Sequence, residues 1–214
     1  MTDGASASGR FITLEGGEGA GKSTQIARLA DWLRARGREV VTTREPGGSP
    51  GAEMIRKLLV EGPPERWDGT TEALLHFAAR RDHLRSTVWP ALQGGAWVIS
   101  DRFADSTRAY QGYGLGLDLA ILGRLQEIAI GSFRPDLTLI LDLPVDTGLA
   151  RAAARRGSET RYESLPRDFH DRVHEGFREI ARSEPRRCAI VDASRDIAAV
   201  TDGITQVVIE RLGA

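Results

Sequence analysis

Short apolar segments rich in β-branched residues alternate along the chain with longer stretches that repeat an apolar residue every three or four positions. The short segments are typical of buried strands and cover residues 11–15, 39–43, 96–100, 136–143 and 188–194. The longer stretches, such as the one containing Leu119, Leu122 and Leu125, predict amphipathic helices. Alternating strands and helices predict a doubly wound, five-stranded parallel α/β sheet with ligands at the carboxyl ends of its strands.

Length and composition favour one compact domain. The chain has 214 residues, of which 41% are hydrophobic, and this is enough for a sizeable core. We expect a flexible tail over residues 1–9 and one domain over residues 10–214, with a loop between two helices at residues 62–69.

The remaining composition narrows the class of protein. The net charge of −1 gives no basic surface for nucleic acid or an anionic membrane, and no apolar run approaches the ~18 residues of a membrane span. Cys188 is the only cysteine, so no internal disulfide can form. The first residues lack the apolar core of a secretory signal. These features predict a reduced, cytoplasmic protein.

A glycine-rich motif, Gly16-x-x-x-x-Gly21-Lys22-Ser23, follows the first predicted strand and opens the first predicted helix. In that context it predicts a phosphate-binding loop, or P-loop, for ATP and Mg²⁺. The backbone amides would cradle phosphate oxygens, Lys22 would reach the terminal phosphates, and Ser23 would ligate the metal. The residues assigned to ATP are Gly16, Gly17, Gly19, Ala20, Gly21, Lys22, Ser23 and Thr24. Lys22 is one of only two lysines among 29 basic residues.

The P-loop leaves the class of nucleotide-binding protein open. A GTPase switch needs Asn-Lys-x-Asp to read guanine, and this chain contains no asparagine. The chain also lacks Asp-x-x-Gly. A small-molecule kinase and an ATP-binding regulatory module remain, and Glu18 raises a further question because it places a negative charge inside a loop built for phosphate.

Candidate acceptor residues follow the second and third predicted strands. Arg44 precedes Glu-Pro-Gly-Gly, a rigid turn that can hold a guanidinium toward a phosphate. Asp101 can orient hydrated Mg²⁺, and Arg102 can bind the phosphate of the acceptor. Phe77 and Arg81 lie four apart on a predicted helix and could stack on and hydrogen-bond a base, the alternative for Phe77 being a core residue.

Four motifs make the sequence resemble thymidylate kinases, which phosphorylate dTMP with ATP. They are TREPGG at 43–48, LLHFAARRDH at 74–83, DRFADSTRAYQG at 101–112 and RAAARRGSETRYE at 151–163. The resemblance runs from Phe11 to about Glu210 without large gaps. It implies a P-loop kinase fold, Mg²⁺-dependent transfer of the ATP γ-phosphoryl group to give dTDP and ADP, and a homodimer formed through helices beside the sheet.

The resemblance also implies roles for particular residues. Phe77 would stack on thymine, and Arg81 would bond its edge. The motif reads Ala-Ala-Arg-Arg here, so Arg80 is a second candidate, although the spacing from Phe77 favours Arg81. Glu18 would accept a hydrogen bond from the 3′-hydroxyl group of the deoxyribose. The residues that would line the base and sugar pocket are Ser106, Thr107, Tyr110 and Gln111. His76 is expected to serve helix packing.

A lid is expected over about residues 151–164. Some thymidylate kinases carry an arginine in the P-loop, but Gly19 occupies that position here. Transferring a phosphoryl group calls for additional cations, and the family resemblance places Arg151, Arg155, Arg156 and Arg161 on the lid. We expect Arg156 and Arg161 to be catalytic, the alternative being a solvated helix face. Another nucleoside monophosphate or a deoxynucleoside remains an alternative substrate.

Overall fold

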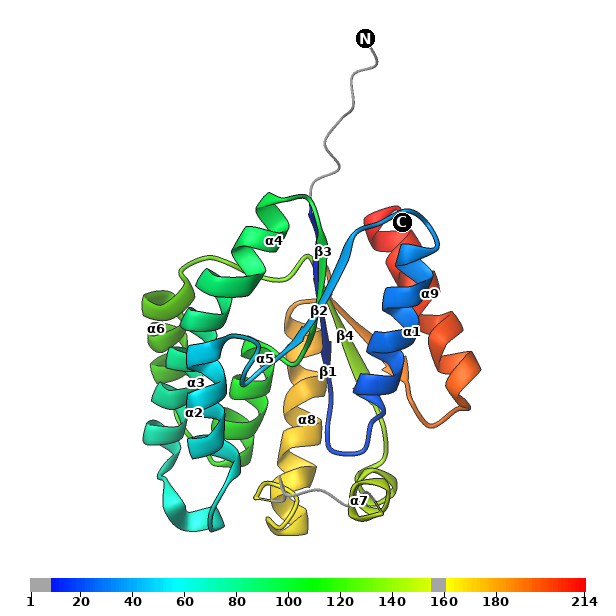
Figure 1. The fold of residues 1–214 in the computed structure, drawn as a ribbon. Helices are drawn as coiled ribbons and strands as arrows, with labels where there is room; N and C mark the ends of the chain where they lie inside the picture. Colours follow the sequence, from blue (N-terminus) through cyan, green and yellow to red (C-terminus); the bar gives the residue numbers. More distant parts are fainter. Residues whose placement is uncertain (1–8, 155–160) are drawn as a thin grey trace.

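Five parallel strands form the centre of the computed structural model, which describes residues 9–154 and 161–214 (Figure 1). The strands are β1 (Phe11–Glu15), β2 (Val40–Arg44), β3 (Trp97–Asp101), β4 (Leu137–Asp142) and β5 (Cys188–Asp192). Their order in the sheet is β2-β3-β1-β4-β5, and every neighbouring pair is parallel. The predicted fold class is confirmed, and each strand ends within two residues of its predicted position.

The helices cover both faces of this sheet (Figure 1). They are α1 (Lys22–Arg34), α2 (Pro50–Val60), α3 (Gly69–His83), α4 (Trp89–Gln93), α5 (Ala104–Thr107), α6 (Leu119–Ile130), α7 (Val145–Ala153), α8 (Arg167–Ser183) and α9 (Ile197–Leu212). A short 3₁₀ turn, η1 (Pro64–Arg66), interrupts the predicted loop, and two π-helical segments, η2 (Leu84–Val88) and η3 (Arg108–Gly114), continue α3 and α5. Residues 1–8 of the predicted tail lie outside the described residues.

The alternation of side chains along the strands explains the two layers. Ile12 and Leu14 of β1 pack in the same apolar cluster as Leu29 of α1 and Ile204 of α9. Phe11 points to the other face, where it packs with residues of β3, η2 and α6. Both faces are therefore covered, which is why the parallel strands consist of almost continuous apolar residues.

Side-chain caps fix the beginnings of several helices. Asp68 accepts a hydrogen bond from the backbone N–H of Thr71 at 2.8 Å where α3 begins, and Asp196 accepts one from Ala199 at 2.8 Å where α9 begins. Ser49 caps α2, and Pro50 occupies its first position. These caps satisfy backbone donors that have no partner inside the helix, so the sequence determines where these helices start.

A buried ion pair joins α5 to the segment before β5. Asp105 is 3% exposed, and its carboxylate accepts two hydrogen bonds from Arg187, at 2.6 and 3.0 Å. Arg187 also donates to the hydroxyl of Thr138, which in turn bonds Thr13 on the neighbouring strand at 2.8 Å. Polar groups in this part of the interior are thus paired with one another, as burial requires.

We predict that Asp105→Asn lowers the free energy of unfolding by about 3 kcal/mol, because it leaves the Arg187 charge buried beside a neutral amide. Urea denaturation measures this change. The control is Asp171→Asn, which removes an exposed ion pair with Arg167 on α8 and should change stability by less than about 1 kcal/mol. Equal, small losses in the two variants would contradict the prediction.

Candidate active site

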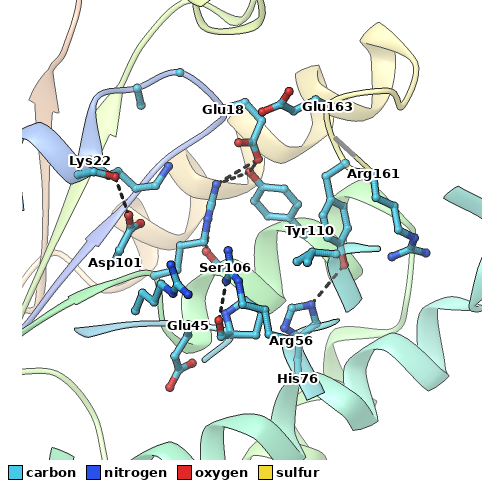
Figure 2. A pocket seen from close by; sticks show the side chains of 18 of the residues that line it. Glu18, Lys22, Glu45, Arg56, His76, Asp101, Ser106, Tyr110, Arg161 and Glu163 are labelled. Carbon is cyan, nitrogen blue, oxygen red and sulfur yellow. Dashed lines mark hydrogen bonds and ion pairs between the residues drawn. The ribbon is translucent and has the colours of Figure 1, made fainter. Parts of the chain in front are cut away.

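A cavity of about 570 Å³ opens at the carboxyl ends of β1, β2 and β3, where ligands of doubly wound sheets bind. Figure 2 shows the side chains that converge on it from the P-loop, from the loops after β2 and β3, and from α3 and η3. Of the predicted site residues, those that line it are Glu18, Gly19, Ala20, Gly21, Lys22, Ser23, Arg44, Asp101, Arg102, Ser106, Tyr110, Gln111 and Arg161.

The P-loop conformation depends on glycine. Gly19 and Gly21 have backbone φ values of +67° and +89°, which residues other than glycine rarely adopt. A Cβ atom at position 19 would also lie 2.1 Å from the carbonyl oxygen of Gly148 on α7. An arginine at position 19 would therefore strain the loop in this conformation, which is consistent with the glycine found there.

Lys22 begins α1 and is almost completely buried. Its Nζ atom donates hydrogen bonds to the carbonyl oxygens of Gly16 at 3.2 Å and Gly17 at 3.0 Å, so the lysine is folded back over its own loop. Burial and the neighbouring Arg102 lower its pKa to about 8. An anion bound in the loop would favour the charged form of Lys22.

Ser23 and Asp101 lie side by side at the edge of the cavity. The Ser23 hydroxyl donates to a carboxylate oxygen of Asp101 at 3.3 Å. Among the described residues no group of three or more His, Cys, Asp or Glu side chains could hold a metal ion by itself. One hydroxyl and one carboxylate do fit Mg²⁺, which keeps several waters and shares its coordination with substrate phosphates.

Arg102 connects the P-loop to η3. Its backbone has φ +69°, in the left-handed region that non-glycine residues seldom occupy. Its guanidinium donates to the carbonyl oxygen of Gly16 at 3.0 Å, to Ser106 at 3.1 Å, to Glu18 at 3.1 Å and to Tyr110 at 3.0 Å. A strained backbone with so many partners is typical of a functional site.

The same contacts answer the question that Glu18 raised. Its Oε1 atom accepts hydrogen bonds from both Arg102 and Tyr110, the latter at 2.7 Å (Figure 2). Burial alone would raise the pKa of the Glu18 carboxyl, but Arg102, Lys22 and the Tyr110 hydroxyl together lower it to about 2. The negative charge in the loop is therefore compensated by its neighbours and persists at neutral pH.

Glu15, at the end of β1, is a buried carboxyl that sequence reasoning missed. It accepts hydrogen bonds from the backbone N–H of Phe103 at 2.7 Å and from Ser106 at 2.6 Å. Burial and the nearby Asp105 raise its pKa to about 8. It lies beneath the site and fixes the turn that follows Arg102.

The loop after β2 is held by α3 and α2. Glu45 is buried and bonds Arg80 at 2.7 Å and His83 at 2.9 Å, and the Glu45–Pro46 peptide bond is cis. Arg44 is half exposed and pairs with Glu53 at 3.2 Å. Arg44 lies on the cavity wall as predicted, although its counter-ion was not foreseen.

Neither Phe77 nor Arg81, the residues of α3 predicted to bind the base, lines the cavity. Phe77 is buried against Ala73 and Leu122, outside the cavity lining. Arg81 donates to the carbonyl oxygen of Ala129 and stacks on the Trp89 ring. His76 lines the cavity instead, and Arg80, four residues later, is 2% exposed and donates to Thr107 at 3.1 Å. One residue turns the helix by about 100°, so Phe77 and Arg81 face α6.

The lid prediction also needs correction. Arg161 lies at the cavity, but it is 4% exposed and forms an ion pair with Glu72 on α3. It also donates to the carbonyl oxygens of Leu59 and Pro63, each at 3.2 Å. Its guanidinium is thus already paired with a carboxylate and two carbonyl oxygens, contacts that the sequence did not predict. Arg155 and Arg156 lie outside the described residues, and Arg151 is exposed on α7.

A signal for the missed residues was present in the sequence. Glu72, His76, Arg80 and His83 repeat at spacings of four, four and three along one face of α3, and three of the four are buried. Polar residues at helical spacing mark a face of the helix that is directed at a site. Ala73 and Phe77 lie on the adjacent, apolar face. Other lining residues that were not singled out are Glu45, Pro46, Arg56, Val60, Tyr162 and Glu163.

None of the helices in the described part of the chain is long and apolar enough to cross a membrane. This agrees with the hydropathy of the sequence.

Four other predicted site residues lie in the described part of the chain but do not line the cavity: Gly16, Gly17, Thr24 and Thr107. The hydroxyl of Thr107 accepts a hydrogen bond from Arg80, which is buried behind the cavity lining.

Sequence and fold are both similar to those of thymidylate kinases. The sequence profile of the family "Thymidylate kinase" matches residues 14–204. A thymidylate kinase of Caulobacter vibrioides is 56% identical over 205 residues, which cover 96% of this chain and 98% of that protein. One from Rhodopseudomonas palustris is 56% identical over 207 residues, which cover 95% of this chain and 90% of that protein. The crystal structure of thymidylate kinase from Ehrlichia chaffeensis matches with a TM-score of 0.75 and 35% sequence identity. The match covers 94% of this chain and 98% of that chain.

Proposed function

The chain belongs to the thymidylate kinase family, and we propose that it transfers the γ-phosphoryl group of ATP to dTMP, with Mg²⁺, giving dTDP and ADP. As a member of that family it is a kinase that phosphorylates dTMP to dTDP. The observation that carries the proposal is that one cavity holds both a P-loop and a set of acceptor residues. The structure therefore supports a kinase over a silent ATP-binding module.

Two buried polar atoms support thymine as the base. Gln111 lines the cavity, and its Oε1 atom has no hydrogen-bond partner among the described residues; the same is true of Nη1 of Arg80. An unpaired buried acceptor and donor need a ligand to satisfy them. Thymine offers the complement, because its N3–H donates and the adjacent O4 accepts. His76 on the cavity wall supplies a flat ring for the base to contact.

We assign the sugar and phosphate of dTMP to the residues around Arg102. Glu18 is ionised at neutral pH and can accept a hydrogen bond from the 3′-hydroxyl group. Tyr110, whose hydroxyl bonds both Glu18 and Arg102, lies where it can contact the sugar. Arg102 and Arg44 are the cations on the wall that can bind the acceptor phosphate.

ATP is assigned to the P-loop. The backbone amides from Gly16 to Thr24 and the Nζ atom of Lys22 would hold its phosphates, with Ser23 and Asp101 as the residues that would hold Mg²⁺. The bound Mg²⁺ would neutralise charge on the phosphate oxygens during transfer. Lys22 and Arg102 supply cations from this chain, and Arg156 of the lid remains a proposed third cation.

We also propose that the protein forms a homodimer through α2, α3 and α6. Large apolar side chains are exposed on these helices, including Leu58, Leu74 and Ile128, which are 38%, 51% and 83% exposed. Such clustered apolar surface is typical of protein interfaces. We predict a dimer in light scattering and a monomer for the variant Ile128→Glu, with a monomeric parent protein as the contradicting outcome. A cytoplasmic location stays a prediction from the sequence.

The function is tested by coupled measurement of ADP release with a panel of nucleoside monophosphates. We predict release with ATP and dTMP, loss of release when Mg²⁺ is removed with a chelator, and kcat/KM for dTMP at least about tenfold above that for dCMP, dGMP and dAMP. Preference for another monophosphate or a deoxynucleoside would identify a different kinase. ATP binding without ADP release on any acceptor would identify a regulatory module.

The role of Glu18 is tested by replacing either partner of the proposed hydrogen bond. We predict that Glu18→Gln lowers kcat/KM for dTMP by roughly ten- to a hundredfold, the range for a hydrogen bond to a charged group. The loss with 3′-deoxy-dTMP should be much smaller, because that acceptor has no 3′-hydroxyl to hold. Equal losses with both acceptors would instead assign Glu18 to orienting Arg102.

A further inference from the structure

Glu72 connects Gln111 to residues 161 and 162, in the last part of the predicted lid. Its side chain is 2% exposed and lies on the polar stripe of α3. One carboxylate oxygen forms an ion pair with Arg161. The other accepts hydrogen bonds from the amide nitrogen of Gln111 at 2.9 Å and from the hydroxyl of Tyr162 at 3.0 Å. Three elements of the site therefore meet at one buried carboxylate.

This contact determines which way the Gln111 amide is turned. A side-chain amide presents donors at one end and an acceptor at the other, whereas a carboxylate can only accept. Glu72 therefore holds the nitrogen end of Gln111, and the Tyr162 hydroxyl lies 3.3 Å from the same nitrogen. The oxygen end is left without a hydrogen-bond partner among the described residues, on a side chain that lines the cavity. Turning the amide over would place its oxygen against the carboxylate, and two acceptors would repel each other.

We propose that Glu72 is a specificity-determining residue that acts through Gln111. By fixing the amide, it ensures that the base meets an acceptor, which suits the N3–H of thymine and opposes the N3 lone pair of cytosine. Glu72 does not touch the base itself, so it is a positioning residue. This inference rests on the proposed function, because it assumes that Gln111 contacts the base of the acceptor.

The charge of Glu72 is held in place by contacts that do not involve the base. Arg161 is its counter-ion and is fixed by the carbonyl oxygens of Leu59 and Pro63. The ion pair therefore attaches residues 161 and 162 to α2 and α3, on the same carboxylate that orients Gln111. Losing the ion pair between Glu72 and Arg161 would therefore alter how Gln111 is oriented. A shift of Gln111 would in turn alter the position of residues 161 and 162.

The experiment compares Glu72→Gln with a reversed pair, Glu72→Gln/Gln111→Glu. A glutamine at position 72 can donate to Gln111, so the amide at 111 can turn its nitrogen to the base. We predict that the ratio of the dCMP inhibition constant to the dTMP KM falls at least about tenfold in Glu72→Gln. In the reversed pair the carboxylate at position 111 offers acceptors only. The ratio should therefore recover most of its parent value, although Arg161 still lacks its counter-ion.

The control for lost stability is Asp105→Asn, which removes a carboxylate from a largely buried arginine pair outside the cavity. Its ratio should stay within about threefold of the parent value. An unchanged ratio in Glu72→Gln, or no recovery in the reversed pair, overturns the inference about Glu72. The proposed function still stands in that case if the parent enzyme prefers dTMP to dCMP. If the parent enzyme shows no preference for dTMP over dCMP, both proposals fall.

Discussion

The contact between Arg102 and Glu18 is the interaction on which the geometry of the site depends. Arg102 belongs to the turn after β3, its backbone N–H donates to Leu14 of β1 at 3.0 Å, and its guanidinium reaches the P-loop carbonyl of Gly16. Glu18 holds the other side of that guanidinium. Two segments that are far apart in the sequence, β1 with its P-loop and the turn after β3, are thus tied at one point, and the φ of +69° at Arg102 is the strain that this arrangement requires.

Charge balance around this contact explains the opposite behaviour of two glutamates three residues apart. Glu15 is surrounded by apolar β-sheet with Asp105 nearby, and its pKa is raised to about 8. Glu18 is slightly exposed to the cavity, and Arg102 and Lys22 lower its pKa to about 2. One carboxyl is therefore neutral and structural at neutral pH, and the other is charged and faces the cavity. The different environments give one loop both a rigid base and an acceptor for hydrogen bonds.

The sequence was sufficient for the sheet, the P-loop and the residues after β2 and β3, because each is set by local pattern: buried strands, glycines with positive φ, and side chains at strand ends. It was insufficient for Phe77 and Arg81, since a spacing of four fits two adjacent faces of α3 equally well, and only the packing of Phe77 against Leu122 decides between them. The ion pair of Arg161 with Glu72 joins residues 89 apart in the chain, a contact that no local pattern contains.

The polar stripe on α3 connects these observations. Glu72 orients Gln111, His76 lines the cavity, Arg80 binds Glu45, and His83 bonds the same carboxylate. Arg80 and His83 hold the loop after β2, whereas Glu72 holds η3 through Gln111 and also pairs with Arg161, so α3 sets the distance between these three segments. A helix packed on α6 by its apolar face is rigid enough to impose that distance. On the proposals made above, selectivity for the acceptor depends on one face of one helix, whereas the chemistry of transfer depends on the P-loop and Arg102.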